Sequence, residues 1–142
     1  MALRFEWLSF IYLQLKSNDK IVIFEQTIPM NFTVDPQGQI VVVRAEVAKL
    51  DASNAPELKA HFLQLHKVGA NYILLDMSKT HYCDSSGLSA VLIGNRLCNE
   101  SDGKLVLSGL QPSVHKLIEI AQLDKVLHIG HNTHAALDLL AK

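Results

Sequence analysis

One stretch of sequence decides the fold of this chain: Asp76-Met77-Ser78-Lys79-Thr80-His81-Tyr82-Cys83-Asp84-Ser85-Ser86-Gly87-Leu88. The apolar run of residues 72–76 that leads into it predicts a buried strand. Residues 88–98 carry apolar side chains over a wide helical face, which predicts a helix packed against the core. A strand joined to a helix by a polar loop is the building unit of α/β domains, so we expect that class of fold.

Upstream of this stretch, the sequence predicts a β-hairpin. Residues 32–34 form the first expected strand, and the continuous β-branched run 40–43 forms a second strand that is buried on both faces. Between them, Asp35-Pro36-Gln37-Gly38 contains the residue types of a tight turn.

A helix is expected between this hairpin and residue 72. Pro56 suits its first turn, Ser53 or Asn54 can accept bonds from its free N–H groups, and Gly69 marks its end. The apolar residues that recur at helical spacing and face the sheet are Leu58, Phe62 and Leu65.

Further elements follow the central stretch. Residues 104–107 and 126–129 are expected strands, and helices are expected from Pro112 and over residues 135–140. Alternating strands and helices predict crossover helices that link the strands of one sheet. The expected architecture is therefore a single α/β domain, with a small mixed β-sheet of four to five strands packed against about four helices.

The composition limits the function classes. Apolar residues make up 49% of the chain, which is enough for a folded core. A formal net charge of −1 argues against the basic surface that nucleic-acid-binding proteins use. The two cysteines, Cys83 and Cys98, match neither a disulfide framework nor a zinc-ligand pattern. We therefore expect two buried thiols in a reducing compartment, no metal and no other cofactor.

The N-terminal residues stand apart from this pattern. The apolar stretch 5–15 is interrupted by Glu6 and Gln14 and is shorter than the roughly 20 residues that span a bilayer. We therefore expect a cytoplasmic protein without membrane contact. Residues 1–29 are expected to be an N-terminal extension, or the product of an upstream start codon with Met30 as the natural first residue. Residues 30–142 are expected to form the domain.

The end of the central stretch carries the chemistry. Asp84 is placed to cap the following helix, because its carboxylate can accept from N–H groups one turn in. Ser85 and Ser86 then lie at a helix start, where unpaired N–H groups and a partial positive charge are exposed. Gly87 has no Cβ, so we expect that a partner can approach both serines closely.

Several motifs in this order carry a family resemblance. Asp84-Ser85-Ser86-Gly87-Leu88 follows a strand that ends in Asp76-Met77-Ser78, and residues 103–114 contain a strand, a short loop and a helix that begins near a proline. Leu50-Asp51 precedes the first helix, and Leu123-Asp124-Lys125-Val126 leads into the last strand. From Met30 to the C-terminus, the chain resembles the STAS domain, specifically the bacterial anti-sigma factor antagonists.

This resemblance implies a phosphorylation-controlled switch. In the family, the serine directly after the aspartate is the phosphate acceptor, which corresponds to Ser85. The implied partners are an anti-sigma factor that is itself a serine/threonine kinase, and a metal-dependent serine phosphatase. The unphosphorylated protein sequesters the kinase, and the phosphorylated protein releases it. Asp84, Ser86, Gly87 and Asp51 correspond to the partner-binding surface.

Other interpretations stay open from the residues alone. Ser85 and Ser86 can serve only as helix caps, and Asp51 can be a cap or turn residue before the first helix. A histidine near a serine, here His81 and Ser85, is also found in serine hydrolases. The chain lacks the Gly-x-Ser-x-Gly pattern of such enzymes, so we expect no enzyme activity. The alternative function is a non-switching STAS subunit of another complex, such as an ABC-type lipid transporter.

Overall fold

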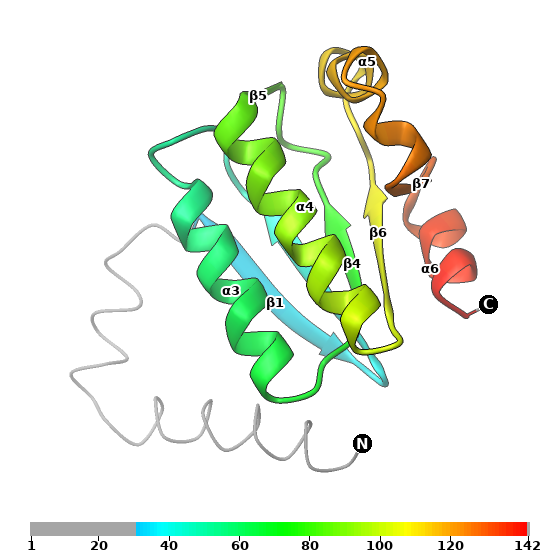
Figure 1. Cartoon of the computed structure of the whole chain (residues 1–142). Coiled ribbons are helices and arrows are strands. Elements are labelled where there is room, and N and C mark those ends of the chain that lie inside the picture. Colours follow the sequence, from blue (N-terminus) through cyan, green and yellow to red (C-terminus); the bar gives the residue numbers. More distant parts are fainter. Residues whose placement is uncertain (1–30, 142) are drawn as a thin grey trace.

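The computed structural model describes residues 31–141 (Figure 1), so the expected N-terminal extension, residues 1–29, lies outside the described residues. The described chain confirms the expected fold class: a mixed five-stranded sheet is packed with four α-helices. In chain order the elements are β1 (Phe32–Gln37), β2 (Ile40–Ala45), β3 (Lys49–Leu50), α3 (Ala55–Lys67), β4 (Tyr72–Asp76), β5 (Tyr82–Cys83), α4 (Ser85–Glu100), β6 (Lys104–Ser108), α5 (Pro112–Ile120), the 3-10 helix η1 (Leu123–Lys125), β7 (His128–Gly130) and α6 (Thr133–Ala141).

The main sheet has the strand order β1-β2-β4-β6-β7. β1 and β2 form the expected antiparallel hairpin, and the remaining neighbours are parallel. Each parallel connection contains a helix, as the alternating pattern predicts. Because β2, β4 and β6 run in the same direction, the loops that follow them lie together at one end of the sheet, beyond the carboxyl ends of these strands.

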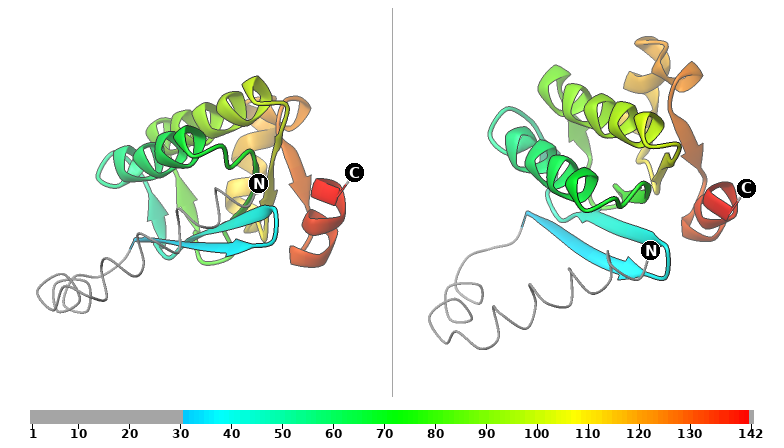
Figure 2. Two further views of the ribbon diagram at one scale, coloured as in Figure 1. Left: turned by 90° about the horizontal axis from the view of Figure 1, so that it is seen from below. Right: turned by 60° about the horizontal axis from the view of Figure 1, so that its bottom comes forward.

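Helices cover both faces of this sheet (Figures 1 and 2). α3 and α4 lie on one face, and α6 lies on the other. Val43 and Leu75 belong to the core under α3 and α4, whereas their neighbours Val42 and Leu74 pack with Ala136 of α6. Burying one such valine or leucine side chain contributes roughly 1.5–3 kcal/mol. Cores on both faces explain why the central strands read as continuous apolar runs rather than alternating ones.

The hairpin turn differs from the expected one. β1 continues through Pro36 to Gln37, and the turn consists of Gly38 and Gln39, with Gly38 at φ 66°. The predicted turn at 35–38 is therefore wrong at residues 35–37, which belong to β1, and right only at Gly38. Proline is tolerated in β1 because this strand lies at the edge of the main sheet, where a missing N–H need not break the ladder.

The last strand and the first helix cap also differ from expectation. Val126 ends η1, whose turn is closed by its bond to the Leu123 carbonyl, so β7 begins two residues later than predicted. Neither Ser53 nor Asn54 caps α3 with its side chain. The Oδ1 of Asn54 instead accepts from the backbone N–H of Asp51 at 3.0 Å, which removes it as a cap.

A second small sheet has no counterpart in the sequence-based predictions. β3 and β5 pair in parallel, with Lys49 opposite Tyr82 and Leu50 opposite Cys83. Each strand has only two residues, which is too short for a periodic pattern to be recognised.

The contact between α3 and α4 depends on a glycine. A Cβ placed at Gly94 of α4 would lie 2.6–2.9 Å from ring atoms of Phe62 in α3. Phe62 is only 1% exposed, so its ring has little room to move. The ring therefore fills the volume that a side chain at residue 94 would need.

We expect Gly94→Ala to lower the free energy of unfolding by about 1–3 kcal/mol, because the two helices must move apart. Without this contact, the same change would stabilise a helix by roughly 0.5–1 kcal/mol. Urea unfolding followed by circular dichroism measures the difference, with Ser89→Ala at an exposed position of α4 as the control. A gain in stability for Gly94→Ala would contradict the packing argument.

Candidate functional site

Ser85 is the first residue of α4, and its side chain is exposed. Its hydroxyl forms no hydrogen bond with another described residue. Ser86, the next residue, is half-buried. The hydroxyl of Ser85 is thus displayed on the surface, where a docking protein can reach it.

Asp84 caps this helix, as the sequence predicts. Its backbone is extended (φ −106°, ψ −173°), and its Oδ1 accepts from the Gly87 N–H at 3.0 Å. This bond satisfies one of the unpaired donors at the helix start. Ser85 therefore lies between a carboxylate, which repels added negative charge, and the positive end of the helix dipole, which attracts it.

Gly87 has a different role from the expected one. It is buried, and a Cβ at this position would lie 2.5 Å from the Leu50 carbonyl oxygen and 2.7 Å from the Cys83 Sγ. The missing side chain lets α4 begin directly against β3 and β5. The absence of a Cβ thus serves packing in the interior, and the expected place of Gly87 in a partner-binding surface stays a prediction.

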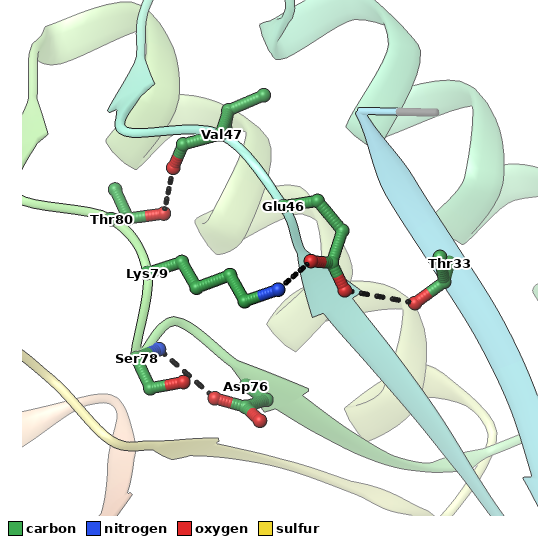
Figure 3. A network of polar contacts seen from close by, with 7 residues as sticks. All are labelled: Thr33, Glu46, Val47, Asp76, Ser78, Lys79 and Thr80. Carbon is green, nitrogen blue, oxygen red and sulfur yellow. Dashed lines mark hydrogen bonds and ion pairs between the residues drawn. The ribbon is translucent and has the colours of Figure 1, made fainter. Parts of the chain in front are cut away.

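The loop between β4 and β5 is held by the segment that follows β2 (Figure 3). Thr80 is fully buried, and its hydroxyl donates to the Val47 carbonyl at 2.8 Å. Beside it, the ammonium group of Lys79 donates to the carboxylate of Glu46, which also accepts from Thr33 of β1 at 3.5 Å. These contacts connect the loop before Ser85 to the edge of the main sheet.

The main chain adds further bonds to the same loop. The N–H groups of His81 and Tyr82 both donate to the Ala48 carbonyl, at 2.8 and 3.2 Å. On the other side, Ser113 of α5 donates its hydroxyl to the His81 carbonyl at 2.6 Å. Asp76, at the end of β4, accepts from the N–H of Ser78 at 2.9 Å (Figure 3). The loop is therefore fixed from two sides.

No feature of the sequence predicts these contacts around the loop before Ser85. Glu46, Lys79, Thr80 and Ser113 belong to no recognisable motif. The bonds from Lys79, Thr80 and Ser113 reach partners 32 or 33 residues away in the chain. Neither the burial of Thr80 nor its partner, a backbone carbonyl, can be recognised from the sequence. Only the folded chain identifies that carbonyl.

The small sheet brings Asp51 to the same region as Asp84. Each residue directly follows a strand of the β3–β5 pair, and the Asp84 N–H donates to the Leu50 carbonyl at 3.2 Å. The Asp51 carboxylate accepts from the Ser53 hydroxyl at 2.6 Å and from the Ser53 N–H at 3.0 Å. Asp51 is therefore a turn residue.

Hydrogen bonds keep Asp51 charged. The bonds from the Ser53 hydroxyl and N–H, with a smaller contribution from the Lys49 ammonium, hold the pKa of the Asp51 carboxyl below its ordinary value. The carboxylate is thus ionised at neutral pH, and its surface position leaves that charge available to a partner.

The cysteines behave as buried thiols. Burial raises the pKa of the Cys83 thiol to about 12, and the nearby Asp84 carboxylate adds to the increase. Burial alone raises the pKa of Cys98 to about 12. Both thiols stay protonated at neutral pH, so Cys83 contributes packing beneath the site and not a nucleophile.

A shallow groove of about 360 Å³ lies beside Ser86, between the starts of α3 and α4. Pro56 and Lys59 line it from α3, and Ser86, Ser89 and Ile93 line it from α4.

Within residues 31–141, no helix combines the length and apolar character that spanning a bilayer requires. The same described range contains no cluster of three or more side chains suited to hold a metal ion.

The fold and the site together define a small α/β domain that presents a serine at the start of a capped helix. The family model of the STAS domain matches residues 31–136. The chain belongs to the STAS domain family.

Known proteins resemble this chain in sequence or in structure. The anti-sigma-B factor antagonist of Staphylococcus aureus (strain NCTC 8325 / PS 47) is 25% identical over 105 residues, which cover 73% of this chain and 97% of that protein. The crystal structure of a protein from Thermotoga maritima described as an anti-sigma factor antagonist (tm1081) aligns with a TM-score of 0.73 at 21% identity. The alignment covers 78% of this chain and 95% of that chain. The structure of the Bacillus cell fate determinant SpoIIAA in its phosphorylated form aligns with a TM-score of 0.60 at 22% identity. The alignment covers 75% of this chain and 96% of that chain.

The cap bond of Asp84 can be separated from its charge. Asp84→Ala is expected to lower the free energy of unfolding by about 1 kcal/mol, because the Gly87 N–H loses its acceptor. Asp84→Asn keeps a side-chain oxygen at the same place and should cost clearly less. Urea unfolding of the two variants measures the difference. Equal losses would show that the carboxylate charge, and not the cap bond, stabilises this helix start.

Proposed function

We propose that this chain is an anti-sigma factor antagonist whose binding is controlled by phosphorylation of Ser85. The observation that carries the proposal is the exposed hydroxyl of Ser85 at the first residue of α4. The chain's STAS family membership and its relative named as an anti-sigma-B factor antagonist support it. A further support is that one protein of the same fold has been solved in a phosphorylated form.

The proposed partners are an anti-sigma factor that is a serine/threonine kinase, and a metal-dependent serine phosphatase, all in the cytoplasm. The chain itself supplies a binding surface and an acceptor hydroxyl and is not an enzyme. The Ser85 Oγ attacks the γ-phosphorus of ATP held by the kinase, a base of the kinase takes the hydroxyl proton, and ADP leaves. The phosphatase returns the hydroxyl by transferring the phosphoryl group to water.

Charge is the proposed basis of the switch. A phosphoryl group adds roughly −1.5 to −2 charges at neutral pH, next to the carboxylates of Asp84 and Asp51. An uncompensated charge buried in an interface costs several kcal/mol, whereas a hydroxyl contributes about 1 kcal/mol through its hydrogen bond. Since about 1.4 kcal/mol is tenfold in affinity, phosphorylation can weaken kinase binding roughly a thousandfold.

No rearrangement of the fold is needed for this change. The loop that leads to Ser85 is held by the buried Thr80 hydroxyl and by two N–H bonds to the Ala48 carbonyl. α4 is fixed at its start by the close contact of Gly87 with β3 and β5. We therefore propose that both forms share one backbone structure and differ in surface charge.

Ser85→Ala is expected to abolish phosphorylation, because the acceptor oxygen is removed. The measurement uses the kinase that copurifies with the full chain, ATP, and intact-mass spectrometry before and after phosphatase treatment. Ser86→Ala is the matched control and should gain one phosphate at the wild-type level. Unchanged phosphorylation of Ser85→Ala would show that the acceptor is another residue.

Ser85→Glu is expected to weaken binding to the same kinase by at least about tenfold, because one added charge has part of the effect of a phosphate. Titration calorimetry with purified kinase measures the affinity, and Ser85→Gln provides a control of nearly equal size without charge. If Ser85→Glu and Ser85→Gln bind equally, the loss comes from shape, and the electrostatic explanation of the switch is wrong.

A further inference from the structure

The small β3–β5 sheet has one inner and one outer face. The paired side chains of Leu50 and Cys83 point inward and are 0% and 5% exposed. Successive side chains of a strand point to opposite faces, so the other pair, Lys49 and Tyr82, lies on the outer face. Both residues are exposed, and Tyr82 shows 52% of its surface.

This outer face continues into the proposed switch. Asp51 follows β3 and Asp84 follows β5, and Ser85 comes next in the chain. Along this surface, the Lys49 ammonium and the Tyr82 ring come first. The carboxylates of the two aspartates follow, and the Ser85 hydroxyl comes last. We name this surface, formed by Lys49, Tyr82, Asp51 and Asp84, the β3–β5 face.

The backbones of Lys49 and Tyr82 hold the small sheet together, but the polar ends of their side chains form no hydrogen bond or close ion pair inside the described chain. The Lys49 ammonium forms no salt bridge with a described residue, and the Tyr82 hydroxyl forms no hydrogen bond with one. A half-exposed tyrosine with charged residues at its edge has the composition of an interface centre with a polar rim. The features that stabilise the fold here, by contrast, point inward: Leu50, Cys83 and Gly87.

We infer that the β3–β5 face selects the partner kinase, an inference that rests on the proposed function. The complementary surface of the kinase carries a carboxylate opposite Lys49, an apolar pocket for the Tyr82 ring, and a cation opposite Asp51 and Asp84. A partner of uniform charge cannot match this alternation, because it would place like charges together on one side. The face thus distinguishes the cognate kinase from relatives that bear a different charge order.

The same arrangement is consistent with the switch. In the complex, the cation of the kinase is already balanced by the two carboxylates of Asp51 and Asp84. A phosphate on Ser85 then adds negative charge without a further counter-charge. Selection by Lys49 and Tyr82 and release through Ser85 are therefore separate functions of adjoining residues.

The test compares two substitutions on the face with two elsewhere. Lys49→Glu and Tyr82→Ala are each expected to weaken binding of the unphosphorylated chain to its copurified kinase by about tenfold or more, through like-charge repulsion and loss of the aromatic contact. Two substitutions on α3, away from the face, are the matched controls. Lys67→Glu reverses an exposed charge as Lys49→Glu does, and Leu63→Ala removes an exposed apolar side chain as Tyr82→Ala removes the ring. Both control variants should bind the kinase with wild-type affinity. Titration calorimetry gives the affinities, and circular dichroism confirms that each variant is folded.

A second measurement addresses the charge directly. Lys49→Gln should bind more tightly than Lys49→Glu and show a weaker dependence of affinity on salt than the wild type, since one ion pair is lost. If Lys49→Glu and Tyr82→Ala bind within twofold of wild type while Ser85 is still phosphorylated, the inference is overturned and the proposed function stands. If the wild-type chain yields no kinase that phosphorylates Ser85, both are overturned.

Discussion

The inward packing of Leu50, Cys83 and Gly87 is the constraint on which the site depends. A Cβ at Gly87 would lie 2.5 Å from the Leu50 carbonyl oxygen, so the start of α4 is seated directly on β3 and β5. Because Leu50 and Cys83 face inward, the residues that follow them, Asp51 and Asp84, emerge at the surface. The packing that closes this end of the core therefore also presents Asp84, the residue before Ser85, together with Asp51, which follows the paired strand.

Around this contact, the frame is built from bonds to main-chain carbonyls. Val47, Ala48 and Leu50 each supply a carbonyl oxygen to the segment that leads into α4. Backbone acceptors hold the position of the loop while its exposed side chains remain free to vary. Substitutions on the β3–β5 face therefore need not disturb the position of Ser85.

Much of the fold could be predicted, because long apolar patterns leave few alternatives. The bounds of β4, residues 72–76, agree with the prediction, and Leu58, Phe62 and Leu65 are buried as expected. The predictions failed where a local signal competed with tertiary structure. Pro36 indicates a turn but lies in an edge strand, and the side chain of Asn54 bonds Asp51 instead of capping α3. At the site, the cap by Asp84 was predictable from its neighbours, whereas the interior role of Gly87 was not.

The sequence by itself determined the fold class, the family resemblance and the helix that begins after Asp84, because these depend on periodicity and on short motifs of contiguous residues. Only the tertiary structure decided that Lys49 and Tyr82 lie next to the residues that lead to Ser85. Lys49 and Tyr82 are 33 positions apart and meet through two-residue strands that carry no periodic signal. Their proximity follows from parallel pairing after a crossover, and distance along the chain contains no information about such a contact.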